Sequence, residues 1–378
     1  MNGRTIVWGT FDCGKPRVRI MLEALRSLEP DLVICHRSPW NGIEDKSVLP
    51  PRARLIVLLR WLAAYPALLL AYLRIPQHDR VVVPYPGILD VLILYPFARL
   101  RGARIYWDMF LSAYDTIVID RQMLRKGSLL AKLLYSTEWL ATRAAGTILL
   151  DTCEHARYIA ALYRLPLAKT KSVWVGVESD VFTPVSTPPT GMPVKVLFYG
   201  QFIPLHGLPV IIEAIREIAS RPEAPAMEFT IIGTGQEQLA IDAMIKQHQL
   251  ENLVRIPWVD YRLLAQKIAN ASICLGVFAA EGKAARVIPN KVFQILAARR
   301  PLVTMDCPAI REIIASGRSI RLVRPGDPSD LANALISLAQ EMCDPARTIE
   351  IHEAAQTEMT TVGVTVVRDQ LATALETL

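Results

Sequence analysis

One turn in the second half of the chain concentrates basic side chains. Within "FAAEGKAARVIPNKVFQ", Phe278 to Gln294, cations stand at Lys283, Arg286 and Lys291. A helical pattern follows at once, and the first amides of a helix are free to bind an anion. Cations that converge on a helix N-terminus suit a diphosphate group. A solvated basic loop is the alternative interpretation.

The same turn contains a predicted helix start. Pro289 and Asn290 are residue types typical of this position, and we expect Asn290 to be the cap. Glu281 places one carboxylate early in the turn.

A second turn, "YGQFIPLHG", has the outline of a phosphate-binding turn without its usual cations. An apolar run reaches Gly200, a short loop follows, and Gly207 opens a helical pattern. Anion-binding turns of this kind commonly recruit Arg or Lys, whereas this loop offers Gln201 and His206. We predict that these two side chains make polar contacts to phosphate or acceptor, with His206 charged only when protonated.

A third turn, "IIGTGQE", contains Gly233 and Gly235 ahead of another helical pattern. Glycines at this spacing let backbone amides approach a ligand, but the third glycine of a dinucleotide-binding motif is missing. The alternative is a tight turn that needs glycine for its own geometry.

The elements that position these turns alternate regularly between strand and helix. Short apolar runs and helical patterns follow one another twice, on either side of a Pro- and Gly-rich stretch at 183–193. Such alternation predicts an α/β protein with two Rossmann-like, doubly wound domains, whose strand ends face a cleft. We expect an N-terminal domain at 1–182, a linker at 183–193, a C-terminal domain at 194–350, and a helical segment at 351–378 that packs back on the N-terminal domain.

Within this scheme each predicted strand has a range. The strands expected in the first half are 5–9, 32–36, 80–85, 104–108, 147–151 and 172–176. Those expected in the second half are 194–200, 228–233, 253–259, 272–278, 301–305 and 319–323, with a helix expected at 308–316.

Composition restricts the partners. The chain has 378 residues, 52% of them hydrophobic, and a net charge of +6. Residues 1–110 contain 15 Lys or Arg and 9 Asp or Glu, and 15 − 9 = 6 accounts for the whole excess. A basic half favours an anionic partner, but the basic clusters lack the interleaved aromatics of single-strand binders, so we expect no nucleic acid. The six cysteines lack C-x-x-C or metal-ligand spacing, which favours reduced thiols and no metal site. The N-terminus resembles no signal peptide, which favours a cytoplasmic protein.

The segment from Leu55 to Arg74 is the strongest membrane candidate. It is strongly apolar but interrupted by Arg60, and it is too short between its charges to span a bilayer. It could lie on an anionic membrane with arginines reaching the headgroups, or it could be a core helix. The candidate membrane or acceptor contacts are Arg52, Arg54, Arg60, Trp61 and Arg74.

The ordered series of turns resembles a known family. "KVLFYGQFIPLHGLPVIIEAI", "FTIIGTGQE", "VRIPWVD", "IANASICLGVF" and "KAARVIPNKVFQILAARRPLVTMDCPAIREII" look like the donor-binding domain of GT-B glycosyltransferases of family 4, over about 130 residues. The resemblance implies a retaining, metal-independent transfer of a sugar from a UDP- or GDP-sugar. It places nucleobase contacts at Trp258 and Val259.

The sequence departs from the family pattern at several positions. Gln201 and His206 stand where the family commonly has Arg and Lys. The family's acidic pair falls on Arg286 and Gln294. By the resemblance, Gln294 would hydrogen-bond ribose and Arg286 would contact phosphate.

In the first half the resemblance implies three further contacts. Gly14 and Lys15 lie in the first strand–helix turn, which the family closes on donor and acceptor. Asp108 ends a predicted strand near the family's cleft His, where it would orient an acceptor hydroxyl. A helix cap or a salt-bridge partner is the alternative for Asp108, and we expect His36 and His155 to be structural.

Together these observations predict a hexosyltransferase acting on a lipid-linked or membrane-proximal glycan acceptor, in glycolipid or polysaccharide biosynthesis. We expect Asp108, Arg286 and Lys291 to act in catalysis, no cofactor, and a peripheral location on the inner face of the cytoplasmic membrane. The alternatives are a non-catalytic sugar-nucleotide-binding or scaffold protein and a sugar-nucleotide epimerase on the same fold.

Overall fold

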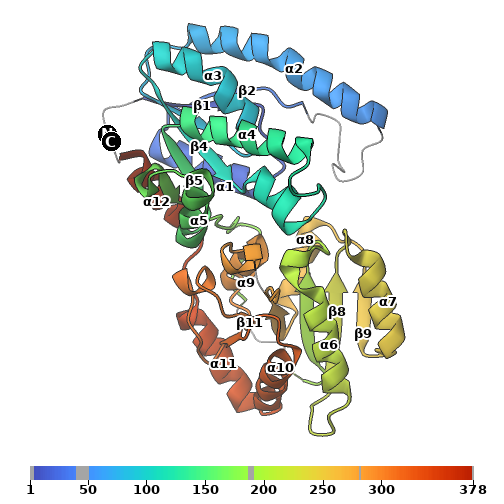
Figure 1. Cartoon of the computed structure of the whole chain (residues 1–378). Coiled ribbons are helices and arrows are strands. Elements are labelled where there is room, and N and C mark those ends of the chain that lie inside the picture. Colours follow the sequence, from blue (N-terminus) through green and yellow to red (C-terminus); the bar gives the residue numbers. More distant parts are fainter. Residues whose placement is uncertain (1–3, 40–50, 186–190, 281, 377–378) are drawn as a thin grey trace. The chain divides into compact units, whose positions relative to one another are not determined.

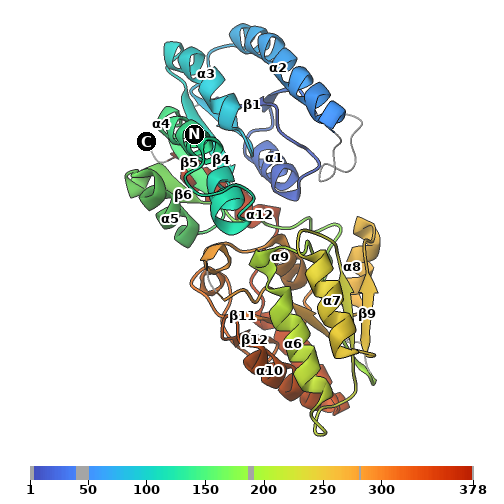
Figure 2. The same cartoon turned by 45° about the vertical axis from the view of Figure 1, so that its right-hand side comes forward.

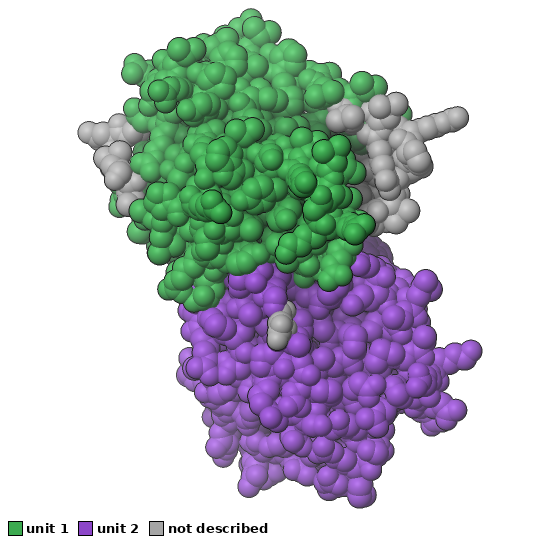
Figure 3. Space-filling view, viewed as in Figure 1, with its two compact units in different colours: residues 1–175, 364–378 green, residues 176–363 purple. Residues whose placement is uncertain are grey.

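The computed structural model describes residues 4–39, 51–185, 191–280 and 282–376. The chain divides into two compact units: unit 1 comprises 1–175 and 364–378, and unit 2 comprises 176–363 (Figure 3). Each unit contains a parallel sheet for which six strands are described. The predicted α/β class with two Rossmann-like domains is therefore confirmed.

Unit 1 has the strand order β2-β1-β3-β4-β5-β6 (Figure 1). All of its described strand pairs are parallel, as repeated strand–helix units require. The strands are β1 (Thr5–Gly9), β2 (Val33–His36), β3 (Arg80–Val83), β4 (Arg104–Phe110), β5 (Thr147–Leu150) and β6 (Thr170–Ser172). The helices are α1 (Pro16–Leu28), α2 (Pro51–Arg74), α3 (Ile88–Leu100), α4 (Leu129–Ala144), α5 (Cys153–Tyr163) and α12 (Val364–Glu376), with a π-helical turn at Asp115–Asp120 and a 3-10 turn at Leu167–Lys169.

Two apolar layers enclose the sheet of unit 1. Buried residues of α2, α3, α4 and α5 form one layer with side chains of the strands, and those of α1 and α12 form the other. The hydroxyl of Tyr106 in β4 donates to the Leu375 carbonyl at 3.2 Å, and the Trp174 amide donates to the Gln370 side chain at 2.7 Å. These contacts attach the C-terminal helix α12 to unit 1.

Unit 2 has the strand order β12-β11-β10-β7-β8-β9, again all parallel in the described pairs, and Figure 2 labels β9, β11 and β12 of this sheet. The strands are β7 (Val194–Tyr199), β8 (Met227–Ile232), β9 (Leu253–Ile256), β10 (Ile273–Leu275), β11 (Leu302–Met305) and β12 (Ile320–Val323). The helices are α6 (Leu208–Ala219), α7 (Gln238–His248), α8 (Tyr261–Ala269), α9 (Asn290–Ala297), α10 (Pro328–Met342) and α11 (Pro345–Glu358). Three 3-10 turns complete it, η3 (Pro204–His206), η4 (Gly282–Ala285) and η5 (Ile310–Glu312).

Several predicted boundaries differ from the structure. The strand expected at 172–176 is β6 at Thr170–Ser172, and the helix expected at 308–316 is only the turn η5. The unit boundary falls at 175/176, before the predicted linker, of which 186–190 lie outside the described residues. The segment expected to pack back on the N-terminal domain is divided: α11 belongs to unit 2 and α12 to unit 1.

Candidate functional site

In unit 2 the turn from Gly200 to Gly207 and the basic turn before α9 meet at the carboxyl end of the sheet. Gly200 follows β7, and α9 begins at Asn290. A Cβ placed on Gly200 would lie 2.9 Å from Cε1 of His206 and 3.0 Å from Nζ of Lys291. The backbone of Gly200 (φ +139°) and the side chains of His206 and Lys291 therefore form one small site.

Lys291 is the central side chain of this site. It is 4% exposed, and within the described part of the chain its Nζ has no hydrogen-bond partner. The amine lies 3.6 Å from the centre of the Phe198 ring, and the Lys291 carbonyl accepts a hydrogen bond from the Tyr199 hydroxyl at 3.1 Å. Burial lowers the pKa of Lys291 well below its usual value because desolvation disfavours the charged amine. A buried amine of this kind is suited to a ligand that supplies negative charge.

The loop between Gly200 and Gly207 fixes the His206 ring beside this amine. Nδ1 of His206 donates to the Gln201 carbonyl at 2.5 Å, since a carbonyl oxygen can only accept. The ring stands edge-on to Phe198, with centroids 5.9 Å apart. His206 is buried, whereas the Gln201 side chain is exposed.

Backbone packing explains the glycines of the third turn. A Cβ on Gly233 would lie 1.9 Å from the Gly200 carbonyl oxygen, and one on Gly235 would lie 2.6 Å from the Phe202 amide nitrogen. The turns after β7 and β8 thus approach each other too closely for any side chain. This geometry agrees with the alternative interpretation, in which the two glycines serve the turn itself.

A second polar group lies one helical turn along α9. Nε2 of Gln294 is 3.4 Å from the Tyr261 hydroxyl, which donates to a carboxylate oxygen of Glu178 at 2.6 Å. Gln294 is buried, and Glu178 is half-buried. Local sequence pattern gives no sign of the Glu178–Tyr261 pair, because 83 residues separate the two and no motif joins them.

The remaining predicted donor contacts have different environments. Lys283 is buried in η4, Arg286 is half-buried, and Glu281 lies outside the described residues. Trp258 is 76% exposed and Val259 half-buried, in the loop after β9.

The predicted helix start needs one correction. Asn290 is the first residue of α9, and Pro289 occupies the cap position without a side-chain hydrogen bond. The expectation that Asn290 caps the helix is therefore wrong. The first amides of α9 have no side-chain cap from Pro289, because proline offers no acceptor there.

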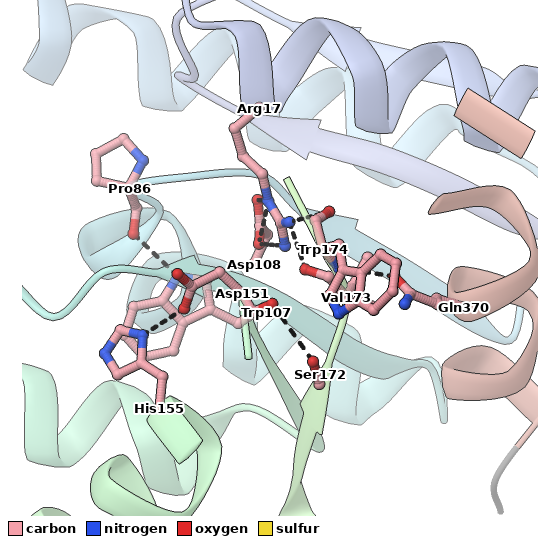
Figure 4. A network of polar contacts seen from close by, with 10 residues as sticks. All are labelled: Arg17, Pro86, Trp107, Asp108, Asp151, His155, Ser172, Val173, Trp174 and Gln370. Carbon is pink, nitrogen blue, oxygen red and sulfur yellow. Dashed lines mark hydrogen bonds and ion pairs between the residues drawn. The ribbon is translucent and has the colours of Figure 1, made fainter. Parts of the chain in front are cut away.

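Asp108 of unit 1 lies inside β4 and is completely buried (Figure 4). It pairs with Arg17 at 2.7 Å, while Nη1 of Arg17 donates to the carbonyls of Val173 and Trp174 at 2.6 and 2.7 Å. Burial raises the pKa of Asp108, and the neighbouring guanidinium opposes that rise. The strand expected to end at Asp108 continues to Phe110, and the carboxylate that was expected to orient an acceptor hydroxyl is paired with Arg17. The alternative, a salt-bridge partner, is the observed arrangement.

Two histidines of unit 1 have structural contacts. His155 is buried, and its Nδ1 lies 2.6 Å from Oδ1 of Asp151 (Figure 4). Nδ1 of His36 donates to the Gly9 carbonyl at 3.1 Å, and its ring stacks on Phe11 with centroids 3.9 Å apart. Both fit the structural role expected of them.

In the first strand–helix turn of unit 1, Gly14 and Lys15 are exposed. The Gly14 amide donates to Oδ1 of Asp12 at 2.9 Å, and Lys15 occupies the cap position of α1.

The helix α2 has an inner face in the core and an apolar outer face. Ala64, Tyr65, Leu68 and Tyr72 are buried, whereas Arg60 and Arg74 are exposed. Trp61 is half-buried and donates to the Thr10 hydroxyl at 2.5 Å, so it contacts the protein itself. The side chains of Arg52 and Arg54 lie outside the described residues. No helix in the described chain combines the length and apolarity that crossing a membrane requires.

The described residues contain no group of three or more His, Cys, Asp or Glu side chains arranged to hold a metal ion.

Solved structures define the class of this fold as GT-B. The whole chain matches that of HepE from Anabaena, solved with UDP and glucose, with a TM-score of 0.69 at 11% identity and complete coverage of both chains. Sucrose-phosphate synthase from Thermosynechococcus elongatus gives a TM-score of 0.69 at 14% identity, covering 99% of this chain and 98% of that one. The lipopolysaccharide outer core galactosyltransferase WaaB gives 0.63 at 15% identity, covering 98% of each chain.

Sequence comparisons point to glycosyltransferases as well. Residues 193–341 match the family model described as glycosyl transferases group 1. WcaL of Salmonella typhimurium, assigned by name as a colanic acid biosynthesis glycosyltransferase, is 25% identical over 54% of this chain and 50% of its own length. The amylovoran biosynthesis glycosyltransferase AmsK of Erwinia amylovora is 26% identical over 47% of this chain and 44% of its own length. The matches thus span about half the length of these curated relatives or less.

Proposed function

We propose that this chain is a glycosyltransferase that moves a sugar from a nucleotide-diphosphate donor to a glycan acceptor of the cell envelope. The observation that carries the proposal is the buried amine of Lys291, in the first turn of α9. The amine lies beside Gly200 and has no hydrogen-bond partner among the described residues. A diphosphate would satisfy this amine and the first amides of α9 together. The group 1 match over 193–341 and the relatives named for polysaccharide biosynthesis support the same reaction class.

The chemistry assigned to the site is stabilisation of the leaving diphosphate. Charge develops on its oxygens as the bond to the sugar breaks, and a preorganised cation in a dry site stabilises that charge strongly. Lys291 and the α9 amides would provide this stabilisation without a metal. Transfer with retention, as the resemblance to family 4 implies, is part of the proposal.

The donor class is a UDP- or GDP-sugar. HepE, with the same fold, was solved with UDP and with UDP-glucose, which supports UDP as the first candidate. Gln294, Tyr261 and Glu178 would then face the part of the donor beyond the diphosphate, where their amide, hydroxyl and carboxylate suit sugar hydroxyls.

The acceptor is proposed to be lipid-linked or membrane-proximal, with the protein peripheral on the cytoplasmic face of the membrane. The exposed leucines and arginines of α2 and the basic first 110 residues support this part. No nucleic acid, cofactor or metal enters the proposal.

Isothermal calorimetry against UDP, GDP and their sugars tests the donor part directly. We expect binding of one nucleotide series in the micromolar range, which is usual for enzyme substrates. Failure of both series to bind would overturn the proposal.

A turnover assay separates the enzyme from its two alternatives. Gln201, His206 and Gln294 replace charged residues of the family pattern, which favours a binding protein as the second candidate. Release of UDP or GDP that depends on an extract of envelope lipids supports transfer. Tight binding without release would indicate a non-catalytic binding protein, and isomerised donor without acceptor would indicate an epimerase.

A further inference from the structure

The outer face of α4 exposes large apolar side chains to solvent. Leu129 is 83% exposed, Leu130 61%, Leu133 62% and Leu140 51%, and Met123 just before the helix is 64% exposed. With about 100° of rotation per residue, Leu129, Leu133 and Leu140 lie within about 40° of one another around the helix. They therefore form one stripe, and such a stripe on a folded protein usually marks an interaction surface.

These leucines do not take part in the packing of α4 against the rest of unit 1. Its inner face contributes small or polar buried residues, Ala131, Glu138, Ala141 and Thr142. Tyr135 adds a hydroxyl that donates to the Leu162 carbonyl at 3.0 Å. The stripe is consequently not part of the core, and we expect substitutions in it to leave the fold intact.

The charged residues that are exposed beside the stripe, Arg125, Lys126 and Lys132, are all basic, and Asp120 just before the segment is half-buried. Between 121 and 145 the basic residues are Arg121, Arg125, Lys126, Lys132 and Arg143, and the carboxylate is Glu138 alone. Glu138 is buried and accepts hydrogen bonds from the Ser112 hydroxyl at 2.7 Å and the Ala113 amide at 2.7 Å. The exposed surface is therefore apolar and cationic.

An aromatic side chain completes the pattern. Trp139 is 37% exposed, and the Arg143 guanidinium lies over its ring at 3.8 Å. Leucine and tryptophan on one side, with Lys and Arg beside them, are the composition of helices that lie in a membrane interface.

We infer that the α4 surface, meaning Met123, Leu129, Leu130, Leu133 and Leu140 with Arg125, Lys126 and Lys132, docks on an anionic lipid bilayer. The leucines would enter the headgroup–acyl boundary while the cations contact lipid phosphates. A second copy of this chain is a poorer occupant. In a two-fold dimer through this face, Arg125, Lys126 and Lys132 would meet their own like charges.

The position of α4 in unit 1 would bring a docked bilayer close to the edge of the sheet where ligands bind. Because α4 returns from β4 to β5, its N-terminal half, which bears Leu129, Leu130 and Leu133, lies toward the carboxyl ends of these strands. Sheets of this kind bind their ligands at that edge. In Figures 1 and 2, α4 lies beside α3 in the layer that also contains α2. This part of the inference rests on the proposed function, since a lipid-linked acceptor would reach unit 1 beside α4.

Vesicle flotation of the full chain tests the docking. We expect the protein to float with phosphatidylcholine vesicles containing phosphatidylglycerol, weakly with phosphatidylcholine alone, and less as salt rises. The double variant Leu129→Glu/Leu133→Glu should lower the bound fraction about tenfold or more. Lys132→Glu should weaken binding only to the anionic vesicles.

Matched variants assign the effect to α4. Leu239→Glu, at a leucine of α7 that is 88% exposed, should float like the wild type. The double variant Leu59→Glu/Leu70→Glu changes the outer face of α2 in the same way. If it stops floating while the α4 variant floats like the wild type, the docking surface is on α2 and the inference is wrong. Equal flotation of the wild type and the α4 variant, or no flotation of the wild type, would overturn the inference. So would a dimer in light scattering that the α4 variant dissociates, since the occupant is then a second copy.

Calorimetry with UDP on the same variants keeps the two proposals separate. The α4 variant should bind UDP like the wild type, because Lys291 and its neighbours belong to unit 2. If the wild-type chain floats but binds no nucleotide, the proposed function is refuted, while the inference that the α4 surface docks on a bilayer still holds.

Discussion

The amine of Lys291 lies 3.6 Å from the centre of the Phe198 ring, at the end of β7 in unit 2. The electron-rich face of an aromatic ring stabilises a cation partially, but it does not replace the hydrogen bonds that an ammonium group makes in water. Burial consequently lowers the pKa of Lys291, and the amine remains available to an anion beside Gly200.

Replacing Lys291 should remove most of the donor affinity. We expect Lys291→Met to weaken UDP binding about tenfold to a hundredfold, because a hydrogen bond to a charged group contributes about 1.5–3 kcal/mol. The melting temperature should stay the same or rise, since methionine leaves no buried polar group. Calorimetry and thermal unfolding measure the two effects. Lys267→Met on α8, an exposed lysine, should change neither, and unchanged affinity in Lys291→Met would move the phosphate site elsewhere.

Donor binding should depend on pH through the same amine. In the free protein the pKa of Lys291 is lowered, and a bound diphosphate favours the charged form, so binding takes up a proton above that lowered pKa. UDP affinity should therefore fall as pH rises through this window. Calorimetry in two buffers of different ionisation enthalpy reports the proton uptake directly. The uptake should vanish in Lys291→Met; an identical uptake there would assign it to another group, such as His206.

A methyl group at Gly200 should close the site. In Gly200→Ala the new Cβ would meet Cε1 of His206 at 2.9 Å and Nζ of Lys291 at 3.0 Å, at a φ of +139°. We expect at least a tenfold loss of UDP affinity and a destabilisation of about 1–3 kcal/mol. Gly282→Ala is the control for backbone strain alone. Gly282 also has a positive φ, but a Cβ there would meet nothing within 4 Å. If both variants bind UDP equally well, Gly200 does not shape the site.

The pair Arg17–Asp108 should act on stability. Removing one partner of a buried ion pair costs about 3–5 kcal/mol, so Asp108→Ala should lower the free energy of unfolding by that amount. The double variant Arg17→Met/Asp108→Leu should be more stable than Asp108→Ala, since it leaves no unpaired buried charge. Chemical denaturation measures both. An Asp108→Ala protein of normal stability that lacks turnover would restore the catalytic role.

Asp90 should make stability depend on pH in the acid range. It is buried, with Thr10 donating both its amide and its hydroxyl at 3.0 Å, and burial raises the pKa of Asp90 from 3.8 to about 6. Between these values the folded state binds more protons than the unfolded state, so the free energy of unfolding falls as pH rises from about 4 to about 6. Asp90→Asn should remove this slope and gain up to about 3 kcal/mol at neutral pH. Melting curves from pH 4 to pH 7 test it, and parallel curves for the two proteins would contradict it.

Much of the fold follows from the sequence alone. Strand–helix alternation predicts two parallel sheets, because neighbouring parallel strands require a crossover between them. The turns with Gly200 and Lys291 were also visible as local patterns, since glycine, cations and a helix start are properties of short segments. Local pattern likewise identified α2 as apolar, but not which of its faces is buried.

Tertiary structure decided what those residues contact. Asp108 meets Arg17 across 91 residues, and Tyr261 meets Glu178 across 83, so neither pair leaves a local signal. The burial that lowers the pKa of Lys291 comes from β7 packing beside α9, and the return of α12 to unit 1 depends on Tyr106 and Trp174. Sequence specifies which chemical groups are present and which elements they form. Folding determines which groups lose water, and that loss gives Lys291 its altered pKa and Asp108 its structural role.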